Sequence, residues 1–183
     1  MKQDINNELW SSIYTIFYNK LPLEIINNIY QKILFKPSNK RELRDAVDAW
    51  CENKRVAIRK YGDIKYWDTS KITDMSELFS NKKTFDDNIS LWDVSNVKNM
   101  SLMFRGAKSF NQPIGSWNVF NVKNMKFMFC EASSFNQPIG DWNVFNVANM
   151  SFMFYKAKSF DQNLDNWNIN IQPLPKNVFV SYK

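Results

Sequence analysis

Apolar side chains recur at a fixed interval along the second two thirds of the chain. Tryptophan returns every 25 residues between Trp67 and Trp167, and rows of methionine and phenylalanine keep the same step. Apolar positions in register over such a period are typical of repeat proteins, in which each unit is stable only when stacked against its neighbours. We therefore expect one shared core. The main rows are Trp67, Trp92, Trp117, Trp142 and Trp167; Met75, Met100, Met125 and Met150; and Phe79, Phe104, Phe129 and Phe154.

Two segments of each repeat predict different local structures. The segment "NQPIGSWNV" contains a proline turn and a short extended stretch, and its Gly115 permits an unusual backbone angle. The segment "NMSLMFRGA" predicts a short helix, because Asn99 stands at an N-cap and Met100 and Phe104 share one face. Equivalent caps are Asp74, Asn124 and Asn149. We expect an α/β solenoid of leucine-rich-repeat-like coils, with one short strand and one short helix per 25-residue repeat. An all-β coil without a helix is the alternative.

The pattern before residue 61 is helical. Apolar residues at three- and four-residue steps predict a first amphipathic helix, and Pro22 suits the first turn of a second. In a third, Asn39 and Glu42 have the spacing of a capping box. We expect residues 1–60 to form an all-α region that caps the solenoid. Residues 61–183 then form four full coils, a partial fifth and a C-terminal capping tail.

Polar positions repeat with the same period. Asn111 and Asn136 follow phenylalanines of one row, and stacked amides of this kind hydrogen-bond to the turns of neighbouring coils. The first repeat departs from the pattern, with Thr69 in a valine row and Lys82 in an alanine row. Such departures are expected of a terminal repeat, because it has one open face.

The residue composition excludes several kinds of chemistry. The chain has no histidine and two cysteines, Cys51 and Cys130, which we expect to be buried and inert. Without histidine there is no Ser-His-Asp triad, no Cys-His pair and no histidine metal ligand. The carboxylates Asp86, Asp87 and Asp161 fall at positions of the polar ladder and not at a catalytic pair. We therefore expect no enzymatic activity, no cofactor and no metal site.

The net charge of +6 does not indicate a nucleic-acid partner. Lysine and arginine are spread along the chain without a basic run, which favours a solvated surface over a stripe that follows phosphates. The row that contains Lys98 and Lys123 is interrupted by Ala148 in the next repeat. We expect no nucleic acid among the partners.

No segment predicts insertion into a membrane or export. No stretch reaches the length of apolar residues that a membrane span needs. The N-terminal segment lacks the charged start and apolar block of a secretory signal. We expect a monomer in the cytoplasm, or in the host-cell cytoplasm if the source is viral.

Partner specificity is expected where the repeats differ. Ser70 and Ser95 occupy one turn position in the first two repeats, whereas Phe120 and Phe145 occupy it in the next two. We predict that the two rings stack and form an exposed patch that a protein partner buries. Simple drift, with the rings folded against the neighbouring turn, is the alternative. A second variable row holds Ser80, Arg105, Cys130 and Tyr155, of which Arg105 and Tyr155 are further candidates for partner binding.

The unit "WDVSNVKNMSLMFRGAKSFNQPIG" resembles the repeat of the BspA-like leucine-rich-repeat surface proteins, which occur in bacteria, protists and large DNA viruses. Trp92, Met100 and Phe104 fall where that family has them, and the resemblance covers residues 67–167. It implies a non-catalytic scaffold that binds other macromolecules. Because many members are secreted or lipid-anchored, it also implies a surface adhesin as an alternative.

The segment "LPLEIINNIYQKIL" is similar to the opening of the F-box. Leu21, Pro22, Glu24 and Ile25 stand at the positions of its L-P-x-E-I motif. The resemblance implies that these residues dock the Skp-type adaptor of a cullin-type ubiquitin ligase, while the repeats hold the substrate. A helical cap that only seals the first coil is the competing interpretation.

Overall fold

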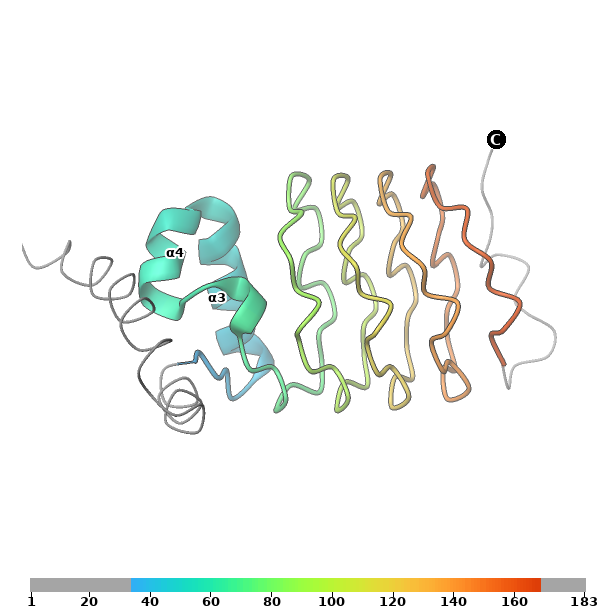
Figure 1. Ribbon diagram of the computed structural model, residues 1–183, viewed down its shortest axis with the longest axis horizontal. Helices are drawn as coiled ribbons and strands as arrows, with labels where there is room; N and C mark the ends of the chain where they lie inside the picture. Colours follow the sequence, from blue (N-terminus) through green and yellow to red (C-terminus); the bar gives the residue numbers. More distant parts are fainter. Residues whose placement is uncertain (1–33, 169–183) are drawn as a thin grey trace, which may run out of the picture.

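The computed structural model describes residues 34–168, in which two helices precede a row of looped repeats (Figure 1). Helix α3 covers Lys40–Glu52, helix α4 covers Lys54–Tyr61, and the two pack against each other. A short 3-10 helix, η1, covers Ile64–Tyr66 and leads into the first repeat. The two helices predicted before residue 34 and the capping tail lie outside the described residues.

Helix α3 begins as its capping pattern predicts. The Asn39 side chain accepts a hydrogen bond from the Glu42 amide at 3.0 Å, and the Glu42 carboxylate accepts one from the Ser38 amide at 2.8 Å. The bond from Ser38 also lowers the pKa of Glu42 below its ordinary value. Both bonds satisfy amides that a helix start leaves free. The buried side of the helix consists of Leu43, Ala46, Val47 and Trp50, so this predicted helix is confirmed.

Asn53 joins the two helices. Its backbone amide closes the end of α3 on Ala49, and its side chain accepts from the Val56 amide at 3.2 Å to begin α4. Helix α4 ends at Gly62, whose φ of 71° lies in the left-handed region that glycine adopts without steric cost. The helical part therefore ends where the repeat pattern starts.

Backbone hydrogen bonds join each repeat to the next. Leu102 donates its amide to the Lys126 carbonyl at 2.9 Å, and in the next repeat Phe127 donates to Ser151 at 3.0 Å. Other amides of the same segment close turns within the repeat instead. The Arg105 amide, for example, donates to the Leu102 carbonyl at 3.1 Å. One repeat alone would leave its forward-pointing amides without partners, so stacking satisfies the backbone as well as the side chains.

The expected α/β solenoid, with one strand and one helix per repeat, is wrong. In the described part of the chain, the repeats contain no helix, and β-pairing is limited to isolated parallel bridges such as Asn99 with Asn124. The segment predicted as a helix turns at Leu102, whose φ is 61°. An α-helix needs an unbroken right-handed run, so the two left-handed residues of each repeat, here Leu102 and Gly106, prevent it. The all-β alternative fails too, because isolated bridges do not make a strand.

The residues predicted as helix N-caps open turns instead. The Asn99 side chain accepts from the Ser101 amide at 3.1 Å, and the Asn124 side chain accepts from the Lys126 amide at 3.0 Å. A bond to the amide two residues on is an Asx turn. The prediction that these side chains satisfy free amides was correct, but the element that they begin was not.

Two rows of phenylalanine form continuous ring stacks through the interior. Centroids along the first row lie 5.4, 5.5 and 5.8 Å apart. The second row lies beside it, with 3.9 Å between the centroids of Phe104 and Phe110. All five repeat tryptophans are buried, with exposed fractions from 2% to 8%. The prediction of one shared apolar interior is confirmed. The rows are Phe79, Phe104, Phe129 and Phe154, and Phe85, Phe110, Phe135 and Phe160.

Helices α3 and α4 cover the open side of the first repeat (Figure 1). Arg44 donates to the Ser76 carbonyl at 2.9 Å. Trp50 donates its indole N–H to Asp87 at 2.8 Å. Lys82, which replaces alanine here, pairs with Asp48 of α3 at 2.6 Å. Contact with the helices therefore explains the departure at Lys82, whereas the Thr69 hydroxyl donates to the Asp93 carbonyl of the second repeat at 2.8 Å. One hydrophobic cluster extends from Leu43 to Trp167, across the predicted domain boundary at residue 60. The division into two domains there stays a prediction.

Close backbone approach, and not an unusual angle, explains the repeat glycine. A Cβ atom on Gly115 would lie 2.3 Å from the Pro138 carbonyl oxygen, and one on Gly140 would lie 2.7 Å from that of Asn163.

The polar ladder behaves as predicted. Asn111 accepts from the Asn136 amide at 2.9 Å, so side chains of one repeat hold the turn of the next.

Candidate interaction surfaces

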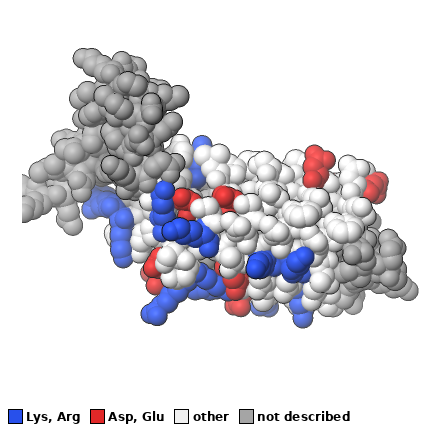
Figure 2. Space-filling view, turned by 90° about the horizontal axis from the view of Figure 1, so that it is seen from below, with Lys and Arg blue, Asp and Glu red and all other residues white. Residues whose placement is uncertain are grey.

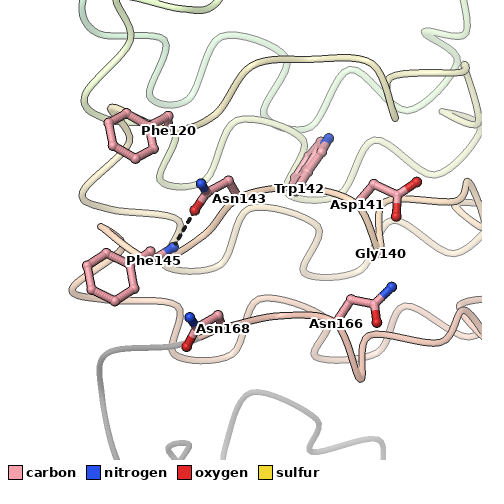
Figure 3. Close-up of a pocket in the computed structure, with 8 residues that line it drawn as sticks. All are labelled: Phe120, Gly140, Asp141, Trp142, Asn143, Phe145, Asn166 and Asn168. Carbon is pink, nitrogen blue, oxygen red and sulfur yellow. Dashed lines mark hydrogen bonds between the residues drawn. The ribbon is translucent and has the colours of Figure 1, made fainter.

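Phe120 and Phe145 project from one edge of the repeat stack (Figure 3). They are 45% and 42% exposed, although the valines beside them, Val119 and Val144, are buried. An inward valine followed by an outward phenylalanine leaves each ring in contact with solvent. The alternative in which the rings fold away against the neighbouring turn does not fit these exposures.

The turn that carries each ring is held by asparagine. Asn118 accepts from the Phe120 amide at 3.2 Å. Asn143 accepts from the Phe145 amide at 3.3 Å, the bond drawn in Figure 3. The Asn146 side chain donates to the Phe120 carbonyl at 2.9 Å, so the two turns are tied together. The rings are thus presented from fixed backbone. No ring-stacking contact joins Phe120 to Phe145, so the predicted stack is wrong.

A shallow groove of about 430 Å³ runs beside the two rings (Figure 3). We call it the edge groove. Its single charged group is Asp141, and amide side chains supply most of its other polar atoms. The lining residues are Phe120, Gly140, Asp141, Trp142, Asn143, Phe145, Asn166 and Asn168.

Seen from below, the repeat stack shows a largely uncharged surface, whereas charges of both signs gather near the helical end (Figure 2).

Arg105 and Tyr155, the other predicted partner-binding residues, do not line the edge groove. Arg105 is exposed, and Tyr155 lies with its ring edge-on to that of Phe152, 6.0 Å between centroids. The four predicted residues therefore mark two separate places and not one surface.

The second place is a strip of aromatic and cationic side chains, of which sequence reasoning identified Tyr155 and missed the others. Phe127 and Phe152 stack with 5.1 Å between centroids and 7° between ring planes. The Lys126 ammonium lies 5.3 Å from the centre of the Phe127 ring, and that of Lys156 lies 5.1 Å from the centre of Tyr155. We call these five residues the aromatic strip.

A signal for the strip was present in the sequence. Its row reads Glu77, Leu102, Phe127 and Phe152, so it changes from acidic to aromatic along the stack. It was overlooked because these residues were assigned to a helix whose apolar face was taken to be Met100 and Phe104.

The cysteines do not form a reactive site. Cys130 is buried as predicted, but Cys51 is exposed, so the prediction of burial is wrong there. Desolvation of its sulfur, helped by the carboxylates of Asp48 and Asp87, raises the pKa of the Cys51 thiol to about 11. Desolvation also raises the pKa of Cys130. Both thiols are therefore protonated near neutral pH, and a protonated thiol is a poor nucleophile.

Other kinds of site were sought in residues 34–168. Within that range, no group of three or more cysteine or carboxylate side chains is placed to hold a metal ion. No helix there is long and apolar enough to span a bilayer. The F-box-like residues Leu21, Pro22, Glu24 and Ile25 lie outside the described range.

The ladder of backbone bonds and the ring stacks define a repeat protein with a continuous aromatic core and turn-rich units. The model of a family described as "Mycoplasma protein of unknown function, DUF285" matches residues 48–172. The chain belongs to this family, which is associated with BspA-like repeat proteins. No curated protein and no solved structure matches the chain.

Proposed function

We propose that this protein is a non-catalytic interaction scaffold that binds a protein partner through the edge groove. The observation that supports this is the pair of exposed rings, Phe120 and Phe145, at a turn position that carries serine in the first two repeats. Large apolar side chains elsewhere in the repeats are mostly buried. An apolar pair on fixed backbone is the kind of anchor that protein partners bury.

The free energy of burying the residues of the edge groove is large enough for a specific contact with a partner. Burying the exposed part of each ring contributes about 1–2 kcal/mol. The asparagine side chains that line the groove supply hydrogen bonds that fix the orientation of a partner, and the single carboxylate, Asp141, adds a preference for a donor or cation. Together, ring burial, hydrogen bonds and the Asp141 charge are large enough for the loss of both rings to abolish partner binding.

Replacement of both rings by serine tests the proposal, because serine is what the chain itself uses in this turn. We expect Phe120→Ser with Phe145→Ser to keep the melting temperature within a few degrees. Partner capture from the native cell should fall by about tenfold or more. Leu91→Ser is the matched control, since Leu91 is 58% exposed, does not line the groove, and aligns with Ser116 of the next repeat.

Two outcomes would contradict the proposal. Equal capture by the double variant and the parent protein would remove the groove from partner binding. Equal loss of capture in Leu91→Ser would mean that any exposed apolar side chain contributes, with no preference for this edge.

The resemblance to BspA-like repeats supports the scaffold proposal, with surface adhesion as its extracellular form. Cell fractionation separates the two. The F-box-like opening supports a further alternative, in which a Skp-type adaptor binds Leu21 and Pro22. A pull-down with purified adaptor that retains the parent chain but not Leu21→Ala with Pro22→Ala would favour that alternative.

A further inference from the structure

The aromatic strip lies on a backbone row that does not favour its residues. Phe127 and Phe152 have φ values of 56° and 57°, in the left-handed region. A bulky side chain in this region costs about 1–2 kcal/mol, whereas glycine and asparagine enter it readily. Four residues on, a second left-handed position holds Asn81 and Gly106 in the first two repeats but Glu131 and Lys156 in the repeats of the strip. Two phenylalanines therefore occupy positions where local conformation favours other residues.

Packing offsets only part of this cost. The parallel stack of Phe127 on Phe152 contributes about 0.5–1.5 kcal/mol. Both side chains are only half-buried, so each ring keeps a surface toward solvent. Glu77 and Leu102 of the same row have φ values of 62° and 61°, so the repeat fixes this backbone, and what distinguishes the strip is the placement of partly exposed phenylalanine on it.

Positive charge surrounds the rings. Lys126 and Lys156 are exposed, and so is Arg105 in the neighbouring row. The Arg105 guanidinium lies near the Cys130 thiol and lowers its pKa against the stronger effect of desolvation. The carboxylate of this region is Glu131, 4.0 Å from Lys156. Three cations against one carboxylate give the strip a net positive charge.

We propose that the aromatic strip binds an acidic peptide segment that carries apolar side chains. Its carboxylates pair with Lys126, Lys156 and Arg105, and its apolar side chains cover Phe127 and Phe152. Charge complementarity selects this occupant. Residues 169–183 of the chain itself contain two lysines and no aspartate or glutamate, so they do not match the strip. This binding is independent of the edge groove.

The test uses the full chain and a short fluorescent peptide in which aspartate alternates with leucine and phenylalanine. A peptide with lysine in place of aspartate is the control. We expect the acidic peptide to bind about tenfold tighter than the basic one at low salt. The difference should shrink as salt screens the lysines.

The decisive variant is Phe127→Asn with Phe152→Asn, because asparagine suits the left-handed backbone. We expect it to weaken acidic-peptide binding about tenfold while the melting temperature stays within a few degrees of the parent. Glu77→Asn is the matched control, in the same row with a φ of 62° and no ring, and should bind like the parent. Lys126→Glu with Lys156→Glu should reverse the preference between the two peptides.

Four results would overturn the proposal. One is equal binding of the acidic and basic peptides, and another is full binding by the double asparagine variant. The third is a parent dimer in light scattering that this variant converts to monomer, which would make a second copy the occupant. If Phe120→Ser with Phe145→Ser also abolished peptide binding, the two surfaces would not be independent, which would contradict the proposal as well.

Discussion

Four of the five core tryptophans donate their indole N–H to a backbone carbonyl. In the regular repeats the acceptor lies in the preceding unit, as in the bond from Trp142 to Ile114 at 3.2 Å and from Trp167 to Ile139 at 3.0 Å. Trp117 is the exception, because its buried indole N–H has no partner among the described residues. Burying the indole N–H is therefore compensated by a hydrogen bond at Trp142 but not at Trp117, although the two occupy equivalent positions of adjacent repeats.

Paired substitutions make this difference measurable. Trp142→Phe and Trp117→Phe remove the same volume from equivalent positions. Trp142→Phe also removes the indole hydrogen bond to the Ile114 carbonyl, which keeps only the bond from the Trp117 backbone amide at 3.1 Å, whereas Trp117→Phe removes an unsatisfied group. We expect Trp142→Phe to lower the free energy of unfolding by about 1 kcal/mol more than Trp117→Phe, as measured by chemical denaturation. A larger loss from Trp117→Phe would disprove this residue-level account.

Residue spacing predicted burial well but conformation poorly. The 25-residue period placed Trp92, Met100 and Phe104 in the core, because burial in a stack depends on position within the repeat alone. It did not reveal Phe127 and Phe152 as a surface pair. The Phe127 amide finds its acceptor, the Ser151 carbonyl, in the next repeat, and the left-handed backbone of this row accompanies that pairing. Local patterns carry no information on that pairing.

At the scale of elements, helix α3 takes the place of a preceding repeat. Lys40 pairs with Asp74 at 3.1 Å, and Arg44 reaches the Ser76 carbonyl. In the next repeat the equivalent Ser101 carbonyl accepts a backbone amide from Glu77 instead. The capping sequence of α3 was readable from Asn39 and Glu42, because a cap is local. The missing repeat helix was not, since the same Asn-Met pattern serves an Asx turn equally well.

Acid should loosen the contact between α3 and the first repeat. Burial raises the pKa of Asp74, but hydrogen bonds from Ser76 and the charge of Lys40 outweigh it and hold the pKa below its ordinary value of 3.8. A depressed carboxyl pKa contributes stability above about pH 4 that is lost as the pH falls through the folded value. Because the pair is partly exposed, the contribution is at most about 1 kcal/mol.

Asp74→Asn isolates this charge, since asparagine holds the same turn at Asn99 and Asn124. We expect the variant to be slightly less stable than the parent at neutral pH. The two proteins should then converge as the pH falls below the lowered pKa of Asp74, because both lack the charge there. Thermal unfolding across this range checks the prediction. A stability difference that stays constant with pH would rule out the ion pair as its cause.

At the scale of the whole molecule, the protein is a stack whose interior is common to all repeats and whose outer surface varies. The edge groove and the aromatic strip both arise where aromatic residues replace polar or smaller ones in the later repeats. The architecture of a shared core could be predicted from one sequence. Which outer rows come together could not, because that depends on the path of the backbone within each repeat.

Amide hydrogen exchange tests most directly whether the repeats form this stack. Leu102 and Phe127 donate their amides to the following repeat at 2.9 and 3.0 Å. We expect slow exchange at both amides, because each is released only when neighbouring repeats separate. Fast exchange at both amides would contradict the inter-repeat ladder, and with it the stacked arrangement that presents both surfaces.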